Sequence, residues 1–233
     1  MAKKGKLIVI DGIDGSGKAT QVKLLAARLK KAGVKIKTID FPRYDANFFG
    51  KLIGEYLSGI YGDFIQTDPR VASVLYAADR FESSKHVRKW LDQGYIVLAD
   101  RYVSANQIHQ GGKIEDQKER KVFLDWLDTM EHKVFGIPRP DLVIYLDVPF
   151  EVSKDWLKQK VAQRKKKYLK EGRKDVAEDN LMHLEHSRNG ALYMAKTHKN
   201  WAKISCCDGM VCMLPEAVHE EVYKTVKGKL KVG

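Results

Sequence analysis

The stretch that decides the fold is Leu7-Ile8-Val9-Ile10-Asp11-Gly12-Ile13-Asp14-Gly15-Ser16-Gly17-Lys18-Ala19-Thr20. Its first four residues form a continuous apolar run, which is typical of a strand buried on both faces of a parallel sheet. The residues after them have the spacing G-x-x-x-x-G-K, whose glycines let a phosphate approach the backbone and whose lysine supplies a cation. Successive amides then face an anion at the start of a helix. The stretch therefore predicts a strand, a phosphate-binding loop and a helix.

One position of this loop departs from the usual pattern. The residue after Lys18 is normally Ser or Thr, whose hydroxyl binds Mg²⁺, and here it is Ala19. A glycine-rich turn without a ligand is the alternative interpretation, but it does not account for a lysine at this offset. We expect the following loop residues to bind ATP: Gly12, Ile13, Asp14, Gly15, Ser16, Gly17, Lys18, Ala19 and Thr20.

The composition is typical of a globular protein with one substantial core. The chain has 233 residues, of which 44% are hydrophobic and 31% charged. No apolar stretch approaches the roughly 18 residues of a membrane span, and we expect no membrane association and no signal peptide. Cys206, Cys207 and Cys212 lack zinc-ligand spacing. They are expected to be reduced thiols in a cytoplasmic protein.

The net charge of +12 is unevenly distributed along the chain. The run from Lys158 to Lys174 contains nine Lys or Arg residues against a single acid, Glu171. This run is either a solvated helix face or a basic flap, around 158–176, that covers phosphates. Apart from Tyr168 it has no aromatic residues that would stack on bases, so anionic small substrates are favoured over a nucleic acid polymer.

Strands alternate with helices along the rest of the chain. Further strands are predicted at 34–41, 95–99 and 142–148 and near Ile204. Helices are predicted after the phosphate loop, at 52–57, 69–93 and 121–132, in two stretches after residue 148, and from Pro215 onward. This alternation predicts an α/β fold, with a parallel sheet covered by helices on both faces.

Two motifs follow predicted strands, at the edge where such sheets bind ligands. Arg43 comes directly after Phe41-Pro42, and an arginine held there suits a bidentate grip on phosphate. Asp100 and Arg101 follow the strand at 95–99. The carboxylate is a candidate Mg²⁺ ligand, and the guanidinium can neutralise a transferring phosphoryl group. A turn arginine and a surface ion pair are the plainer interpretations of these motifs.

The predicted helix at 69–93 contains a second group of candidates. Tyr76 and Arg80 are four residues apart and share one helix face, where they can stack on and hydrogen-bond a base. On this pair alone, a tyrosine at such a position more often belongs to the core. Further polar groups suited to a base or sugar follow the Asp-Arg motif at Asn106, His109 and Gln110.

Together these residues resemble the thymidylate kinases, a family of P-loop nucleoside monophosphate kinases. The resemblance extends over nearly the whole chain: the phosphate loop, Phe41-Pro42-Arg43, residues 76–80, Asp100-Arg101-Tyr102, and residues 106–112, 140–148 and 216–219. It implies a three-layer P-loop kinase fold in a single kinase domain over 1–233. It also implies transfer of the γ-phosphoryl group of ATP to dTMP with Mg²⁺. We expect a cytoplasmic homodimer that binds ATP and dTMP.

The resemblance also implies roles for individual residues. Lys18, Asp100 and Arg101 would be catalytic, with Asp100 serving the metal, and a flap arginine would act with them, either Arg164 or Arg173. His109 stands where the family usually has Tyr or Phe beside the sugar 2′ position, so rejection of ribose would be weaker. The residues that would bind dTMP are Asp14, Arg43, Tyr76, Arg80, Arg101, Asn106, His109 and Gln110.

Two other classes of function remain open on the sequence. A kinase for another (deoxy)nucleotide, or for a deoxynucleoside, would share the fold. A non-catalytic P-loop nucleotide-binding protein would keep the loop and lose metal chemistry at Ala19. The acceptor-side residues Arg43, Arg80 and Asp100 argue against a simple ATP sensor, which has no use for them.

Overall fold

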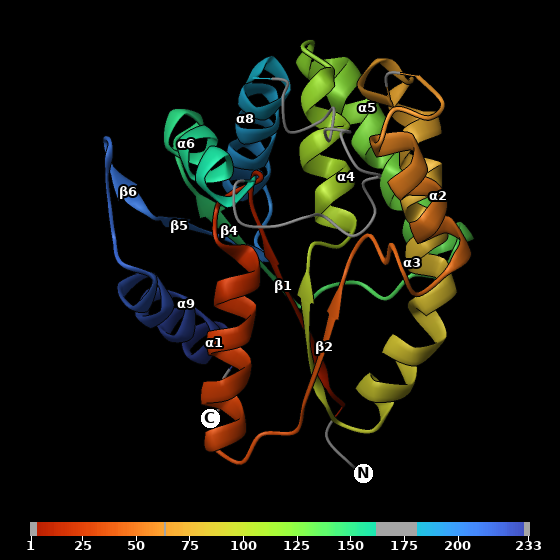
Figure 1. Ribbon diagram of the computed structural model, residues 1–233. Coiled ribbons are helices and arrows are strands. Elements are labelled where there is room, and N and C mark those ends of the chain that lie inside the picture. Colours follow the sequence, from red (N-terminus) through yellow and green to blue (C-terminus); the bar gives the residue numbers. More distant parts are fainter. Residues whose placement is uncertain (1–3, 63, 162–180, 231–233) are drawn as a thin grey trace.

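Five parallel strands form the central sheet, in the order β2-β3-β1-β4-β5 (Figure 1). Their bounds are β1 (Lys6–Asp11), β2 (Ile36–Asp40), β3 (Ile96–Asp100), β4 (Leu142–Asp147) and β5 (Trp201–Ser205). Ile10 pairs with Asp100 on one side of β1, and Asp11 pairs with Tyr145 on the other. The carboxyl ends of the three central strands therefore meet at one edge of the sheet. The computed structural model describes residues 4–62, 64–161 and 181–230.

Helices connect these strands. Before β4 they are α1 (Lys18–Lys31), α2 (Phe48–Leu57), η1 (Phe64–Gln66), α3 (Pro69–Asp92), α4 (Val103–His109), η2 (Gly111–Lys113), α5 (Gln117–Asp128) and the π-helical turn η3 (Thr129–Val134). After β4 the elements are α6 (Phe150–Val161), α8 (Leu181–Thr197), the short strands β6 (Cys207–Asp208) and β7 (Val211–Cys212), and α9 (Pro215–Leu230).

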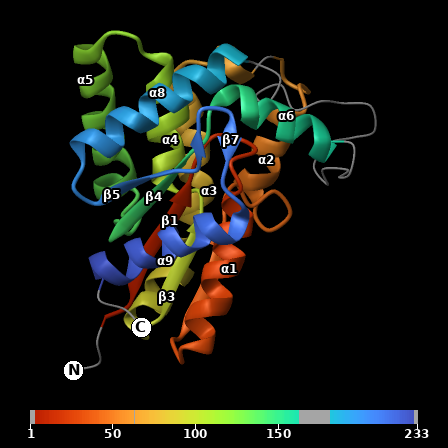
Figure 2. The same ribbon diagram turned by 90° about the vertical axis from the view of Figure 1, so that its left-hand side faces the viewer.

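The apolar strands bury side chains on both faces of the sheet. Val9, Val97 and Val143 belong to a core shared with α3, α4, α5 and α8. Ile8 and Leu98 point to the opposite face, into a core shared with α1 and α9. Figure 2 shows α1 and α9 side by side on that face. The predicted parallel sheet with helices on both faces is confirmed.

Local sequence signals explain the bounds of the longest helix, α3. The side chain of Asp68 caps it by accepting a hydrogen bond of 2.8 Å from the amide of Arg70, and Pro69 occupies the first turn. Gly94, just past its end, has a φ of 78°. The helix predicted at 69–93 is therefore present almost to the residue.

The helices α5 and α4 differ from the prediction, and α2 begins at Phe48 rather than at Leu52. The helix α5 begins at Gln117 rather than at Lys121, because the Asp116 side chain caps it through the amides of Lys118 and Glu119, both at 2.9 Å. The short helix α4 was not predicted. Its seven residues follow the Asp-Arg motif directly and are too few to show a helical apolar period.

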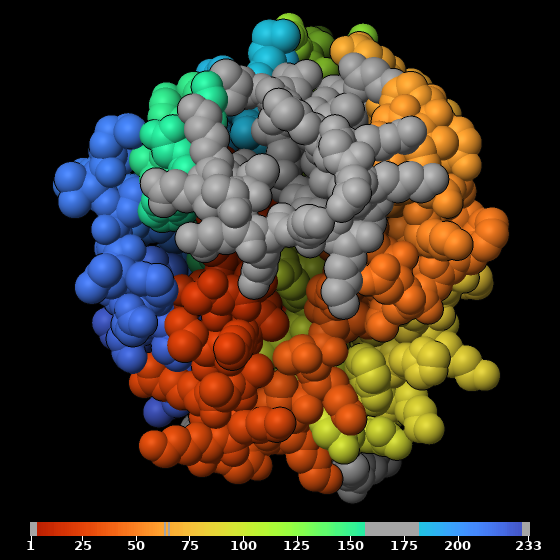
Figure 3. Space-filling model, viewed as in Figure 1, coloured from red at the N-terminus to blue at the C-terminus, as the bar shows by residue number. Residues whose placement is uncertain are grey.

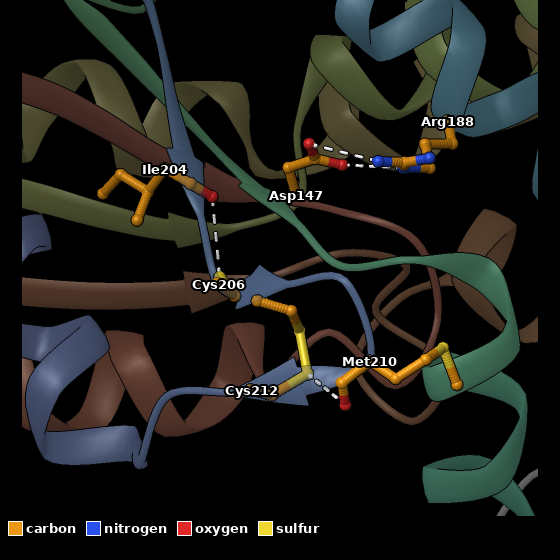
Figure 4. Close-up of a disulfide and its surroundings, with 7 residues drawn as sticks. Asp147, Arg188, Ile204, Cys206, Met210 and Cys212 are labelled. Carbon is orange, nitrogen blue, oxygen red and sulfur yellow. Dashed lines mark hydrogen bonds and ion pairs between the residues drawn. A yellow bond between two sulfur atoms is a disulfide. The ribbon is translucent and has the colours of Figure 1, made fainter.

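The hairpin of β6 and β7 corrects the expectation of three reduced cysteines. Cys207 and Cys212 face each other in its register and form a disulfide (Figure 4), whereas Cys206 is a buried free thiol. Burial raises the pKa of the Cys206 thiol to about 12. The prediction missed the hairpin, which brings together cysteines five positions apart.

The predicted basic flap at 158–176 falls mostly on residues that the structure does not describe. The helix α6 ends at Val161 and α8 begins at Leu181. Both flap candidates, Arg164 and Arg173, therefore lie outside the described residues. Among the helices of the described ranges, none is long and apolar enough to cross a membrane.

Candidate active site

The phosphate loop joins β1 to α1 at the carboxyl edge of the sheet. Gly15 and Gly17 have φ values of 83° and 88°, in the left-handed region that favours glycine. A Cβ on Gly12 would lie 2.4 Å from Ser16 Oγ and 2.9 Å from the carbonyl oxygen of Leu146. These glycines are therefore required for the path of the backbone, as well as for the approach of a phosphate.

Lys18 opens α1, and its ammonium group turns back over the loop. Its Nζ donates hydrogen bonds of 2.9 Å to the carbonyl oxygens of Gly12 and Ile13. Burial lowers the pKa of Lys18, and the charge of Arg101 lowers it further. The cation thus lies at the mouth of the loop, whereas Ala19 is exposed on the helix surface beside it.

Arg101 connects the phosphate loop to the opposite side of the site. Its φ of 62° makes it the one non-glycine residue with a positive φ in the described ranges. The guanidinium forms an ion pair with Asp14 and lies 2.7 Å from Nε2 of His109. Burial opposes the charge of Arg101, but the neighbouring carboxylates, Asp14 foremost, outweigh it and raise its pKa. Strain of this kind is typical of functional positions.

Asp100 ends β3 and presents a largely buried carboxylate beside Lys18. Burial raises the pKa of Asp100, and the nearby charges of Lys18 and Arg101 counteract this shift. No cluster of three metal-ligating side chains occurs in the part of the chain that the structure describes. A metal at this position would therefore have one carboxylate together with substrate and water oxygens, a donor set that suits Mg²⁺.

Arg43 lies in a loop that α3 holds in place. Arg43 follows the cis Phe41–Pro42 bond, and its amide donates to the buried carboxylate of Asp79 at 3.2 Å. The same carboxylate accepts a bond of 2.7 Å from Nδ2 of Asn47. A Cβ on Gly50 would lie 2.2 Å from the carbonyl oxygen of Arg43, so α2 also packs directly on this loop.

Arg80 and Asn106 meet at a buried carboxylate that the sequence analysis did not single out. Glu131 on η3 accepts hydrogen bonds from Nε of Arg80 at 2.8 Å and from Nδ2 of Asn106 at 2.8 Å. A second contact, from Nη2 of Arg80, makes the ion pair bidentate. Each of the three side chains is at most 1% exposed. Arg80 is therefore a fixed part of the site wall, with its charge compensated.

Tyr76 and Gln110 are two further residues of the predicted acceptor side. Tyr76 is half-buried, and its ring centroid lies 5.8 Å from that of Phe64 in a small apolar cluster with α2. Oε1 of Gln110 and Oγ of Ser73 are buried and have no hydrogen-bond partner among the residues that the structure describes. Buried polar atoms of this kind are expected where a polar ligand completes their hydrogen bonds.

Two serines tie the phosphate loop to helices on either side. Ser104 on α4 donates a hydrogen bond of 2.5 Å to the buried carboxylate of Asp11. Ser153 on α6 donates to the carbonyl oxygen of Asp14. The sequence analysis missed both, because a single serine inside a helix carries no local signal and only the fold brings it to the loop.

The helix α8 also contributes to the site, although the sequence analysis assigned no residue from it. Arg188 donates to the carboxylate of Asp147, at the end of β4, with a distance of 2.8 Å (Figure 4). The ring of His183 stacks on that of His109 with a centroid separation of 5.5 Å. Oγ of Ser187 lies 2.9 Å from Nδ1 of His109. The loop after β1, the residue after β3 and the helices α4 and α8 thus meet around Arg101 and His109.

Comparison with known proteins identifies the family of this chain. A family model described as thymidylate kinase matches residues 10–205. A protein named probable thymidylate kinase, from Pyrococcus abyssi, is 32% identical over 97% of this chain and 98% of its own. The thymidylate kinase of Thermosipho africanus is 31% identical over 83% and 86%. A solved thymidylate kinase structure from Candida albicans, 22% identical, covers 99% of this chain and 94% of its own with a TM-score of 0.71, which shows a shared fold. The chain belongs to the thymidylate kinase family.

Proposed function

We propose that the chain carries out the dTMP kinase reaction, ATP + dTMP → ADP + dTDP, at the carboxyl edge of its sheet with the residues described above. The observation that carries this assignment is the position of Arg101. Its guanidinium contacts Asp14 in the phosphate loop and His109 on the acceptor side, so one cation lies between the two halves of the site.

On the donor side, we assign ATP to the loop from Gly12 to Thr20. Lys18 would exchange the carbonyl oxygens of its own loop for phosphate oxygens, which carry more charge. The loop amides and the start of α1 would bind the inner phosphates. Ala19 provides no hydroxyl, so the loop would hold ATP through its amides and the lysine.

On the acceptor side, Arg43 and Arg101 would hold the phosphate of dTMP, and Asp14 would reach the sugar hydroxyl. The half-buried Tyr76 would stack on thymine, because its packing against Phe64 fixes the ring on one side. The remaining base-side residues would be Arg80, Asn106, His109 and Gln110. The buried Oε1 of Gln110, which lacks a partner, supports this placement.

The chemistry of this site would be positioning and neutralisation of charge. The oxygen of the acceptor phosphate is already a nucleophile, so no general base is needed. Lys18 and Arg101 would stabilise the negative charge that develops on the transferring group. Asp100 would hold Mg²⁺, which when bound would neutralise phosphate oxygens. Arg164 or Arg173 would add a further cation from the flap, and the whole chain, 1–233, would form one kinase domain.

The proposal includes a homodimer. Apolar side chains on α2 and α3 are exposed: Phe48 by 70%, Val71 by 56%, Val74 by 40% and Phe81 by 49%. Figure 3 shows the orange surface that includes α2 on the opposite side of the molecule from the blue C-terminal segments. Exposed apolar side chains of this kind favour a protein–protein contact. Light scattering should give the dimer mass for the wild type and a monomer for Phe81→Asp.

A cytoplasmic location is also part of the proposal. The Cys207–Cys212 disulfide would then be reduced in the cell. Alkylation of thiols in rapidly quenched cells, carried out on the unfolded protein, would test this. Three alkylated cysteines per chain are expected, and a single alkylated cysteine would contradict the cytoplasmic location.

Release of ADP from Mg-ATP, measured across a panel of acceptors, tests the assignment of substrate. We expect dTMP to give the highest kcat/KM, with dUMP behind it by a modest factor, since one methyl group in an apolar pocket contributes about 1–3 kcal/mol. A higher kcat/KM for AMP, GMP or CMP would overturn the assignment. Turnover with thymidine but not dTMP would identify a nucleoside kinase.

A further inference from the structure

The ring of His109 links Arg101 to α8. Its Nε2 lies 2.7 Å from Nη1 of Arg101, and its Nδ1 lies 2.9 Å from Oγ of Ser187. Oγ of Ser187 in turn lies 2.6 Å from the carbonyl oxygen of His183, one helical turn earlier. Four groups, from the residue that follows β3, from α4 and from α8, thus form a continuous chain of hydrogen bonds that ends at the Arg101 guanidinium.

The donors and acceptors of this chain can be assigned without ambiguity. A guanidinium can only donate, so Nε2 of His109 has to accept and carries no proton. The ring proton of the neutral imidazole is then on Nδ1, which donates to Oγ of Ser187. The hydroxyl proton of Ser187 is directed at the carbonyl oxygen of His183, which can only accept. Each link has one donor and one acceptor.

The surroundings of His109 favour this neutral form. Burial lowers the pKa of His109 well below its usual range, and the charge of Arg101 lowers it further. His183 from α8 and Lys18 from α1 act in the same direction, and Asp14 from the phosphate loop opposes them. A protonated ring would have no acceptor for Arg101 and would place two cations 2.7 Å apart.

Close packing of α8 brings the short side chain of Ser187 within reach of the ring. A Cβ on Gly112 would lie 2.5 Å from the carbonyl oxygen of His186. A Cβ on Gly190 would lie 3.0 Å from the carbonyl oxygen of Ile108. The backbones of α8, α4 and η2 therefore lie in close contact on both sides of Ser187.

We propose that Ser187 is a positioning residue for phosphoryl transfer: it holds His109 in the tautomer that accepts from Arg101, and so directs the guanidinium at the reacting phosphate. The proposal rests on the catalytic role proposed for Arg101. Ser187 does not touch the substrate itself. It acts through His109, and the helix that carries it begins at Leu181, just after the segment that contains the flap arginines.

The test compares Ser187→Ala with Ser187→Thr and with Asn189→Ala, an exposed control on the same helix. We expect Ser187→Ala to lower kcat about tenfold, the effect of one hydrogen bond, with a smaller change in the KM for dTMP. Ser187→Thr keeps a hydroxyl that can bond the carbonyl one turn earlier and should restore most of the rate. Asn189→Ala should match the wild type.

Nitrogen-15 NMR of the full chain gives a second readout that needs no turnover. The His109 signals, identified by their absence in His109→Gln, should report the Nδ1-protonated tautomer in the wild type and in Ser187→Thr. A mixture of tautomers is expected in Ser187→Ala. Thermal unfolding of each variant shows whether it is folded, and the tautomer of the wild-type His109 keeps the test open if Ser187→Ala is not.

Three results would overturn the proposal: a wild-type His109 protonated on Nε2, a change of tautomer without a loss of rate, or a loss of rate with the tautomer unchanged. A wild type that has the expected tautomer but does not phosphorylate dTMP would instead contradict the proposed function. The two readouts thus separate failure of the positioning role from failure of the enzymatic assignment.

Discussion

Arg80 and Arg101 are two guanidinium groups in one site, and their surroundings differ sharply. Arg80 is 1% exposed and meets Glu131 in a bidentate pair. Arg101 is more exposed, contacts Asp14 on one side, and faces a neutral imidazole on the other. The difference indicates that Arg80 has its charge satisfied inside the protein. Arg101 keeps bonding capacity for a phosphate and is fixed by its backbone and by His109.

Removing the partner of Arg80 should have the largest effect on stability. Glu131→Ala leaves a buried guanidinium without a counter-charge, and we expect the free energy of unfolding to fall by about 3–5 kcal/mol. Urea denaturation measures this loss. The double variant Arg80→Met/Glu131→Leu is the matched control and should lose much less, because no charge is left unpaired. A loss below about 1 kcal/mol for Glu131→Ala would contradict the anchoring role.

Removing the guanidinium of Arg101 should affect catalysis and leave stability nearly unchanged. We expect Arg101→Ala to lower kcat/KM by about 10²–10³-fold, the usual effect of losing one group that stabilises the transition state. Arg101→Gly, which also relieves the positive φ, should be equally inactive and at least as stable. Steady-state kinetics and circular dichroism test both. A folded Arg101→Ala with near-normal kcat/KM would remove the basis of the comparison.

The carboxylate next to Arg101 should control the metal requirement. Asp100→Asn should lower kcat and raise the Mg²⁺ concentration for half-maximal rate by about tenfold, as loss of a ligand or its support does at other metal sites. Ala19→Ser should lower that concentration, because it restores a hydroxyl at the loop. Titration of Mg²⁺ at fixed ATP and dTMP measures both. An inactive wild type alongside an active Ala19→Ser would point to a binding protein that has lost catalysis.

The smallest effect concerns the pH dependence of the free energy of unfolding. It arises from His109, which contacts Arg101, and from His183, which stacks on His109. Burial lowers the pKa of His183 to about 4 and holds that of His109 well below 6.5, its value in an unfolded chain. The unfolded state therefore binds more protons between about pH 6.5 and 4, and stability, full above pH 6.5, falls as the pH drops through this window. The free energy of unfolding, measured by urea denaturation between pH 7 and 5, should change less with pH for His183→Asn than for the wild type. An identical change in both proteins would refute this origin of acid sensitivity.

Contiguous segments of the sequence predicted their structures well. The residues 7–20 contain a strand, loop glycines and a lysine in one run, so local rules are sufficient for the phosphate loop. Asp68 and Gly94 likewise mark both ends of α3. The alternation of strands and helices predicted the layered parallel sheet. In each of these cases the interacting groups are close in sequence, and the pattern itself carries the physical constraint.

The remainder of the site depends on contacts that are distant in sequence. Glu131 lies 51 positions from Arg80, and Ser187 lies 78 positions from His109. Neither residue belongs to a recognisable motif, because a buried glutamate or a helical serine resembles an exposed one in sequence. The disulfide escaped prediction for a related reason, since the turn at Gly209 had first to be placed between β6 and β7. Only the assembled fold makes these pairs visible.

The order of the strands has a consequence for how the protein is made. The strand β1 pairs with β3 and β4, and β2 lies beyond β3. A growing chain that has not reached Ile96 holds the complete sequence of the phosphate loop without any strand to pair with β1. The nucleotide site is therefore assembled late in synthesis, and its apolar first strand depends on residues translated long afterwards.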